Sequence, residues 1–224
     1  MTAAKPTPSV RIESRWPGVL AVVALLVLMA ILPGRVTLFP AWAPYVLGIV
    51  MLAPMAGAAL TAGKGRWERL ERTITVIFFV IVAAGNLANL ANLLNAMVRR
   101  SEEVGGLQLL ASSIQLWASN VLAFSLLYWQ LDRGGPGARE NLEAVKPDWL
   151  FPQTGAPDDA PPGWQPTFVD YLFLGFSTAT AFSATDALPL TPRAKMLMML
   201  ESAISLVTIV VVASRAINIL GSAP

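Results

Sequence analysis

The sequence contains no cysteine and no histidine, and only 13% of its 224 residues are charged. Without cysteine the chain can form no disulfide, thiol nucleophile or thiolate metal site. Without histidine, a proton relay would have to use carboxylates. The chain also lacks a glycine-rich phosphate loop, a serine nucleophile elbow and a carboxylate–histidine metal cluster. These absences predict a protein that is not an enzyme and that binds no cofactor or metal.

The composition is that of a membrane protein. Hydrophobic residues make up 55% of the chain, whereas soluble domains are about 45–50% apolar and about 25% charged. The formal net charge is only +2, and the basic residues cluster beside apolar runs. That placement indicates membrane topology rather than nucleic-acid binding. We therefore expect an integral membrane protein with the lipid bilayer as its surroundings.

Five apolar runs are each close to the roughly 20 residues that cross a bilayer core. They cover residues 17–33, 41–62, 73–98, 107–131 and 194–220, behind a polar tail, 1–16, that is expected to be disordered. Residues 168–184 form a sixth apolar segment with four Ser/Thr residues, which suits a re-entrant half-helix better than a full span. The expected fold is all-α, with five transmembrane helices and a re-entrant or short pore-like half-helix before the last span.

Residues 132–167 separate the four-helix membrane region, 17–131, from the C-terminal segment, 168–220. They contain seven prolines, six carboxylates and three basic residues, a composition that predicts mostly irregular structure. Trp149, Phe151 and Trp164 are expected to hold this segment against the membrane surface, where aromatic rings prefer to lie. A solvated linker and a functional cap both remain open.

Charge predicts the topology. If four spans precede residues 168–184, then the tail, the basic loop 63–72 and the segment 132–167 all lie on one side. Basic residues near span ends tend to stay cytoplasmic, so we expect a cytoplasmic N-terminus in a multi-pass protein of the cell membrane. Potassium-channel architecture would instead place 132–167 outside. Either the charge rule fails, or the hairpin enters from the cytoplasm, or 168–184 spans the membrane.

The segment 168–184 and the turn after it carry candidate ion-pathway residues: Thr178, Thr180, Ser183, Thr185 and Asp186. Potassium filters need glycines for their ring of carbonyls, and here Ala184 stands where a glycine is expected. Hydroxyls or the carboxylate could line a wider, less selective path. Alternatively, the hydroxyls satisfy backbone groups at the end of a buried half-helix.

The last apolar run carries a polar stripe. At 100° per residue, Ser205 and Thr208 fall within about 40° of Glu201. Ionisable residues in membranes usually face a bundle interior or a watery cavity. The stripe could line an ion pathway. In the other interpretation, Glu201 reaches Arg193 or Lys195 near the helix start.

Four asparagines recur at a spacing of three near the end of the third run: Asn86, Asn89, Asn92 and Asn95. Each step slips by about 60°, so the four side chains wind around the helix and do not share one face. Hydrogen bonds to a neighbouring helix are the favoured role, and a polar permeation path is the alternative. The expected partners lie on the fourth run: Ser112, Ser113, Gln115, Ser119 and Asn120.

The stretch FVDYLFLGFSTATAFSATDALPLTPRAKMLMMLESAISLV resembles the pore helix, turn and inner helix of tetrameric potassium channels, without the glycine filter. It is similar also to a family of uncharacterised bacterial multi-span membrane proteins of the domain-of-unknown-function kind. The positions that carry this second likeness are Asp170-Tyr171, Phe182 to Asp186, and Arg193 with Lys195. The resemblance covers about the last quarter of the chain and implies a pore-like fold.

Two functions are expected from these patterns. The first is a channel-like protein that self-associates, as a tetramer if it conducts, and passes monovalent cations with poor selectivity through a degenerate filter. The alternative is a non-conducting membrane scaffold, or a partner- or lipid-binding protein, that keeps a pore-like fold.

Overall fold

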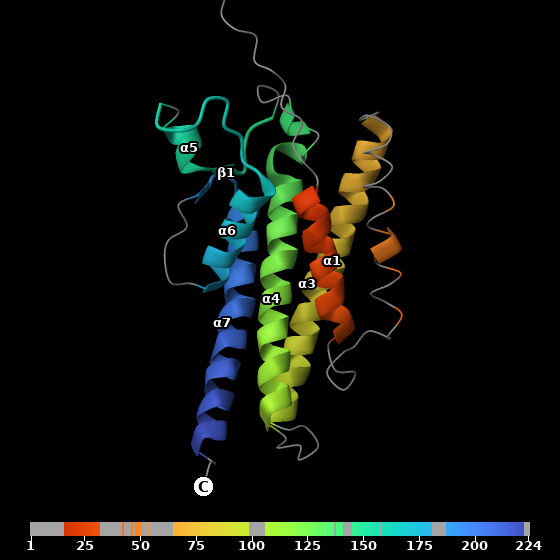
Figure 1. Ribbon diagram of the computed structural model, residues 1–224, viewed down its shortest axis with the longest axis vertical. Coiled ribbons are helices and arrows are strands. Elements are labelled where there is room, and N and C mark those ends of the chain that lie inside the picture. The colour runs from red at the N-terminus through yellow and green to blue at the C-terminus, as the bar shows by residue number, and fades with distance from the viewer. Residues whose placement is uncertain are drawn as a thin grey trace, which may run out of the picture.

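The computed structural model describes residues 16–31, 42, 46, 48–50, 53, 65–98, 106–136, 138–140, 145–156, 158–180 and 187–221. The described chain is mostly helical (Figure 1). Its long helices are α1 (Trp16–Ile31), α3 (Gly65–Val98), α4 (Gly106–Leu131), α6 (Phe168–Thr180) and α7 (Pro192–Gly221). Shorter elements are η1 (Asp132–Gly134), η2 (Ala138–Glu140), α5 (Pro152–Gly155) and the paired strands β1 (Trp149–Leu150) and β2 (Leu188–Pro189).

Helix α4 lies at the centre of the bundle and packs against α1, α3, α6 and α7 (Figure 1). It can do so because small and polar side chains alternate with large apolar ones along its length, so neighbours approach on several sides. Its buried residues include Ser113, Asn120 and Ser125 as well as Phe124 and Trp129. A polar residue buried at this depth needs a partner on a neighbouring helix or on its own backbone.

Four helices begin at the end of the bundle where α4 finishes. A Cβ on Gly18 of α1 would lie 2.8 Å from the ring of Trp129, and Phe168 of α6 stacks edge-on against the same ring at 5.8 Å. Arg72, early in α3, lies beside Gly134. Arg193 of α7 donates a hydrogen bond to the carbonyl of Leu131. We call this end, which residues 132–167 cover, the capped end.

Three helical segments are long and apolar enough to cross a membrane: Arg72–Asn92, Leu110–Gly134 and Pro192–Ser214. They correspond to the third, fourth and last predicted runs, so a mostly helical fold with three candidate membrane-spanning helices is confirmed. Helix α1 is apolar but has 16 residues, about 24 Å of helix. Most of the second predicted run, 41–62, lies outside the described residues, and so does the tail, 1–15.

Helix α6 has 13 residues, about 20 Å in length, which is shorter than a bilayer core of about 30 Å. It runs parallel to α7, because Ser202, about ten residues into α7, donates a hydrogen bond of 3.2 Å to the carbonyl of Thr178, which lies equally far into α6. After α6 the chain comes back to the capped end, where β2 pairs antiparallel with β1. The polar turn, with Ser183, Thr185 and Asp186, lies outside the described residues.

The segment 132–167 folds onto the bundle. Trp149 and Phe151 are buried, and their rings lie 4.8 Å from Tyr128 and 5.3 Å from Tyr171 respectively. The prediction that these aromatic residues hold the segment against the membrane surface is therefore wrong for Trp149 and Phe151. Proline-rich sequence builds little core of its own, but here its aromatic side chains bury themselves against the ends of α4 and α6.

Candidate functional site

Glu201, in the first half of α7, is an ionisable residue whose side chain is fully buried. The hydroxyl of Tyr128 in α4 donates a hydrogen bond of 2.5 Å to its Oε2. Its Oε1 receives no hydrogen bond from the described residues. One neighbouring tyrosine, rather than a cation or an open cavity, therefore meets the carboxyl group within the described structure.

Gly175 of α6 allows three helices to meet around this carboxyl group. A Cβ at Gly175 would lie 3.4 Å from Glu201 Oε1 and 3.3 Å from the carbonyl oxygen of Val121, and it would collide with the hydroxyl of Ser125. Ser125 donates a hydrogen bond of 2.7 Å to the Val121 carbonyl. A residue without a side chain is needed here because a carboxyl oxygen and a hydroxyl already occupy the space.

Ser205, on the same stripe of α7, also contacts α4. Asn120 Nδ2 donates to Ser205 Oγ at 2.9 Å and to the backbone carbonyl of Glu201 at 3.3 Å. Thr208 donates to the carbonyl of Ile204 at 2.8 Å. Ser205 and Thr208 are fully buried, as Glu201 is. The structure thus bonds Glu201 and Ser205 to α4 of the same chain and buries Thr208 with them.

The interpretation that Glu201 reaches Arg193 or Lys195 is wrong. Arg193 forms an ion pair with Asp148, and Lys195 is exposed. The carboxyl group of Glu201 extends toward α4 instead, where Tyr128 lies. The stripe residues lie on one helical face as predicted. The partner of Glu201 is Tyr128 instead of Arg193 or Lys195.

The hydroxyls of α6 bond to helical carbonyls. Thr178 donates to the carbonyl of Leu174 at 2.8 Å, and Thr180 donates to those of Phe176 and Ser177 at 3.0 and 3.1 Å. The last four carbonyls of a helix lack intrahelical partners, and here Thr180 supplies a donor to that of Ser177 and Ser202 to that of Thr178. This is the arrangement that the second interpretation of the hydroxyls describes.

The four asparagines of α3 differ in exposure as their winding predicts. Asn86 and Asn89 are buried, Asn92 is half-buried and Asn95 is exposed. Asn86 Nδ2 is buried without an acceptor among the described residues. Two of the expected partners on α4 bond to other helices, since Asn120 bonds to α7 and Gln115 donates to the carbonyl of Leu28 in α1.

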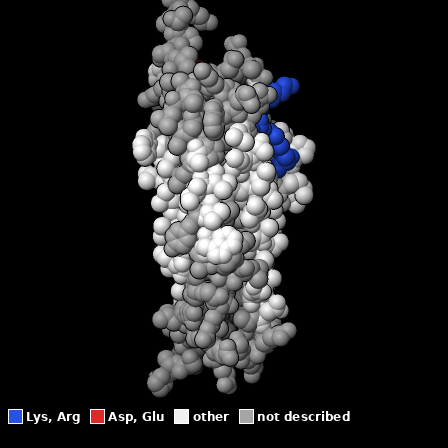
Figure 2. Space-filling view, turned by 90° about the vertical axis from the view of Figure 1, so that its right-hand side faces the viewer, with Lys and Arg blue, Asp and Glu red and all other residues white. Residues whose placement is uncertain are grey.

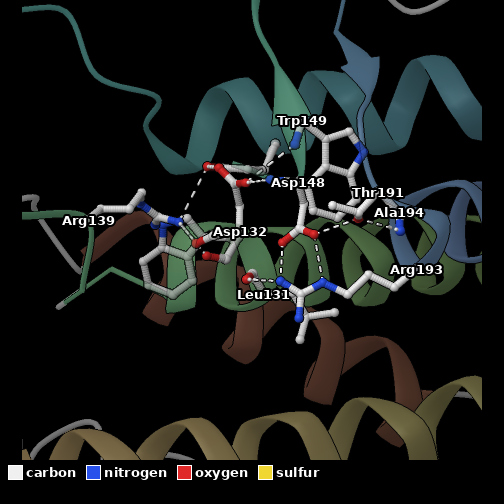
Figure 3. A network of polar contacts seen from close by, with 10 residues as sticks. Leu131, Asp132, Arg139, Asp148, Trp149, Thr191, Arg193 and Ala194 are labelled. Atoms are coloured by element: carbon white, nitrogen blue, oxygen red, sulfur yellow. Dashed lines mark hydrogen bonds and ion pairs between the residues drawn. The ribbon is translucent and has the colours of Figure 1, made fainter. Parts of the chain in front are cut away.

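A second polar cluster holds the capped end together (Figure 3). The guanidinium of Arg193 donates to both carboxylate oxygens of Asp148, and Thr191 donates to Asp148 Oδ1 at 2.6 Å. The side chain of Asp148 is 1% exposed, whereas that of Arg193 is 50% exposed. The backbone N–H of Leu190 donates to the Asp148 carbonyl at 2.7 Å. Residue 148 thereby ties the covering segment to the start of α7.

Asp132 and Arg139 form the other half of this cluster. Asp132 accepts the backbone N–H of Asp148 at 2.7 Å and the hydroxyl of Tyr171 at 2.6 Å. Arg139 is buried and donates to the carbonyls of Trp129 and Asp132 at 2.7 and 3.3 Å. A cation at the C-terminus of α4 is favourable because helix dipoles present partial negative charge there. Each carboxylate therefore has compensating donors nearby.

Sequence reasoning missed this cluster and Tyr128. The signal available was weak: the proline-rich segment carries charges of both signs beside aromatic residues, which indicates that it folds against something. No local periodicity indicates that Tyr128, 73 residues away from Glu201 in the chain, is its partner.

Comparison of the chain with protein-family models, with curated proteins and with solved structures finds no match. The resemblance of residues 168–207 to a pore module and to a bacterial membrane family therefore stays a prediction.

Proposed function

We propose that the protein is a non-conducting membrane scaffold that binds a lipid or protein partner. The observation that carries this proposal is that Glu201 and Ser205 are hydrogen-bonded to α4 of the same chain and that both, like Thr208, are fully buried. A pore on a symmetry axis between copies needs polar groups on the outer surface of each copy. Here the polar groups of the stripe are buried and form hydrogen bonds within one chain.

The outer surface of α7 supports the same proposal. Met196 and Met199 are 63% and 65% exposed, and Leu206 and Val210 are exposed beside them. Exposed apolar side chains on a membrane-spanning helix suit lipid tails, whereas a water-filled path needs polar ones. The polar stripe and this apolar surface lie on different sides of the helix.

The architecture that we propose has five spans, with α1 and residues 41–62 added to the three long apolar helices, and with α6 as a re-entrant half-helix. The parallel course of α6 and α7 supports this assignment. If α6 spanned the membrane, α7 would begin on the opposite side and would run antiparallel to α6. The six described basic side chains outside the bundle core all lie at the capped end: Arg72, Arg133, Arg139, Lys146, Arg193 and Lys195. We accordingly assign the capped end and the N-terminus to the cytoplasm, and the hairpin enters from that side.

A poorly selective cation channel is the second candidate. It is favoured by one observation: a short helix enters from the same end as the following long helix, with a return between them, as in a pore module. In this candidate a homo-oligomer, a tetramer by analogy, would form the path with Asp186 and the neighbouring Ser183 and Thr185.

Cation flux into liposomes that contain the purified protein separates the two candidates. A scaffold gives the same flux as empty vesicles across voltage and pH, while a proven cation channel reconstituted in parallel conducts. Flux that Asp186→Asn abolishes and Lys195→Gln preserves would contradict the scaffold and support the channel. The exposed Lys195 is the control for a change of charge in the same hairpin.

A further inference from the structure

Two arginines at the capped end differ from Arg139 and Arg193 because no acceptor for them lies among the described residues. Arg139 and Arg193 donate hydrogen bonds to several acceptors. Arg72 and Arg133 are half-buried, yet neither forms a hydrogen bond or an ion pair with any residue in the described ranges. A guanidinium carries five donors and a fixed charge, so these two half-buried groups have donors that the described residues leave unused and that a ligand could fill.

Arg72 and Arg133 lie close together although they are far apart in the sequence. Arg72 Nη1 lies 3.6 Å from the position that a Cβ on Gly134 would take. That places it within about 9 Å of the Arg133 Cα, given standard backbone dimensions. An arginine side chain spans most of such a distance, so both guanidiniums can reach one small anion.

Arg133 combines two unfavourable features: a left-handed backbone conformation and a buried donor without an acceptor among the described residues. Its backbone has φ 52° and ψ 22°, in the left-handed region that residues with a side chain rarely adopt. It is the sole non-glycine residue with positive φ in the described chain. Its Nε is buried without an acceptor. Strain that persists at a residue with an unsatisfied donor is a feature of binding sites.

The two arginines stand at the level where lipid headgroups begin. Arg72 is the first residue of the membrane-crossing segment of α3, and the corresponding segment of α4 ends at Gly134, next to Arg133. Figure 2 shows basic side chains near one end of the molecule, while the other described side chains on this face are uncharged. Basic side chains between helices at this level suit phosphorylated headgroups.

We propose that Arg72 and Arg133 together bind a phosphate group at the capped end, carried either by an acidic phospholipid or by a free phosphate anion. Two planar guanidiniums present paired N–H donors that match phosphate oxygens. This site would give the proposed lipid-binding role a specific ligand. The biological role of the site rests on that proposed function, whereas its ability to bind phosphate does not. Its test is separate from the flux assay, which can fail or succeed whatever the arginines bind.

The test uses the full chain in a neutral detergent and measures its thermal unfolding midpoint. The protein is titrated with short-chain phosphatidylglycerol, with phosphatidylcholine of the same chain length, and with inorganic phosphate. We expect phosphatidylglycerol to raise the midpoint and phosphatidylcholine to leave it unchanged. Arg72→Gln and Arg133→Gln should each weaken the apparent affinity for phosphatidylglycerol about fivefold. Lys195→Gln, which removes an exposed charge near the same end, should have no effect.

Arg133→Gly separates loss of the ligand from loss of the fold. Glycine adopts the left-handed conformation without strain, so this variant should unfold at the same temperature as the wild type or higher in the absence of lipid. Its response to phosphatidylglycerol should nevertheless fall as in Arg133→Gln.

A response to inorganic phosphate that depends on both arginines assigns the site to free phosphate, and a response to phosphatidylglycerol alone assigns it to lipid; both support the proposal. Equal stabilisation by phosphatidylglycerol and phosphatidylcholine would overturn it. An Arg72→Gln/Arg133→Gln double variant that responds as strongly as Lys195→Gln would overturn it as well.

Discussion

Gly175→Ala tests whether α4, α6 and α7 meet as closely as the structure indicates. The added methyl group would collide with the hydroxyl of Ser125 and lie 3.3 Å from the Val121 carbonyl and 3.4 Å from Glu201 Oε1. The hydroxyl can move only by giving up its hydrogen bond of 2.7 Å to the Val121 carbonyl. The three helices would otherwise have to separate.

The expected size of the effect follows from opposing contributions. Alanine is favoured over glycine inside a helix by about 1 kcal/mol. Overpacking of a filled site costs about 1–3 kcal/mol, and the lost Ser125 hydrogen bond adds about 1 kcal/mol. The free energy of unfolding should therefore fall by about 1–3 kcal/mol in total. A methyl group that merely filled space would raise it.

Unfolding in mixed micelles with increasing sodium dodecyl sulfate, followed by far-ultraviolet circular dichroism, measures this change. Ser125→Ala in the Gly175→Ala background removes the colliding hydroxyl and should restore at least half of the lost stability. Gly155→Ala is the matched control, because nothing lies within 4 Å of its added Cβ. Gly175→Ala as stable as the wild type, or no recovery in the double variant, would refute the reasoning.

Three other changes are measurable by the same unfolding assay. Tyr128→Phe leaves a buried carboxyl group without its donor and should cost about 1–3 kcal/mol; a loss below 0.5 kcal/mol, about the error of such measurements, would contradict the contact. Asp148→Asn and Arg193→Gln, combined in a double-mutant cycle, should show a coupling energy of about 1 kcal/mol or more, and purely additive losses would count against the pair. Asn120→Ala removes bonds to α7 and should cost more than Asn86→Ala, whose Nδ2 has no acceptor in the described chain; equal losses would argue against this difference.

The sequence predicted the elements that depend on local patterns. Apolar runs of sufficient length identified α3, α4 and α7, and the 100° angular step placed Glu201, Ser205 and Thr208 on one face. The same step predicted that the four asparagines do not share one face of the helix. These features follow from the geometry of one helix and need no knowledge of its neighbours.

Features that depend on pairing between distant segments could not be predicted. Tyr128 meets Glu201 only because α4 and α7 pack together in a particular register, and no spacing within either helix encodes that register. Residues 132–167 present the same problem. Their composition indicates little intrinsic structure, yet Asp148 and Trp149 are buried because the ends of α4, α6 and α7 provide the surface on which they fold.

The central claim is that the polar stripe of α7 is internal packing rather than a water-filled path. Because the chain has no cysteine, single cysteines at Ser205, Thr208 and Lys195 can be labelled in membranes with a membrane-impermeant thiol reagent without background. We predict rapid labelling of Lys195→Cys, which lies at the exposed start of α7, and no labelling of Ser205→Cys or Thr208→Cys on the same timescale. Labelling at positions 205 and 208 at a rate approaching that at 195 would contradict the claim.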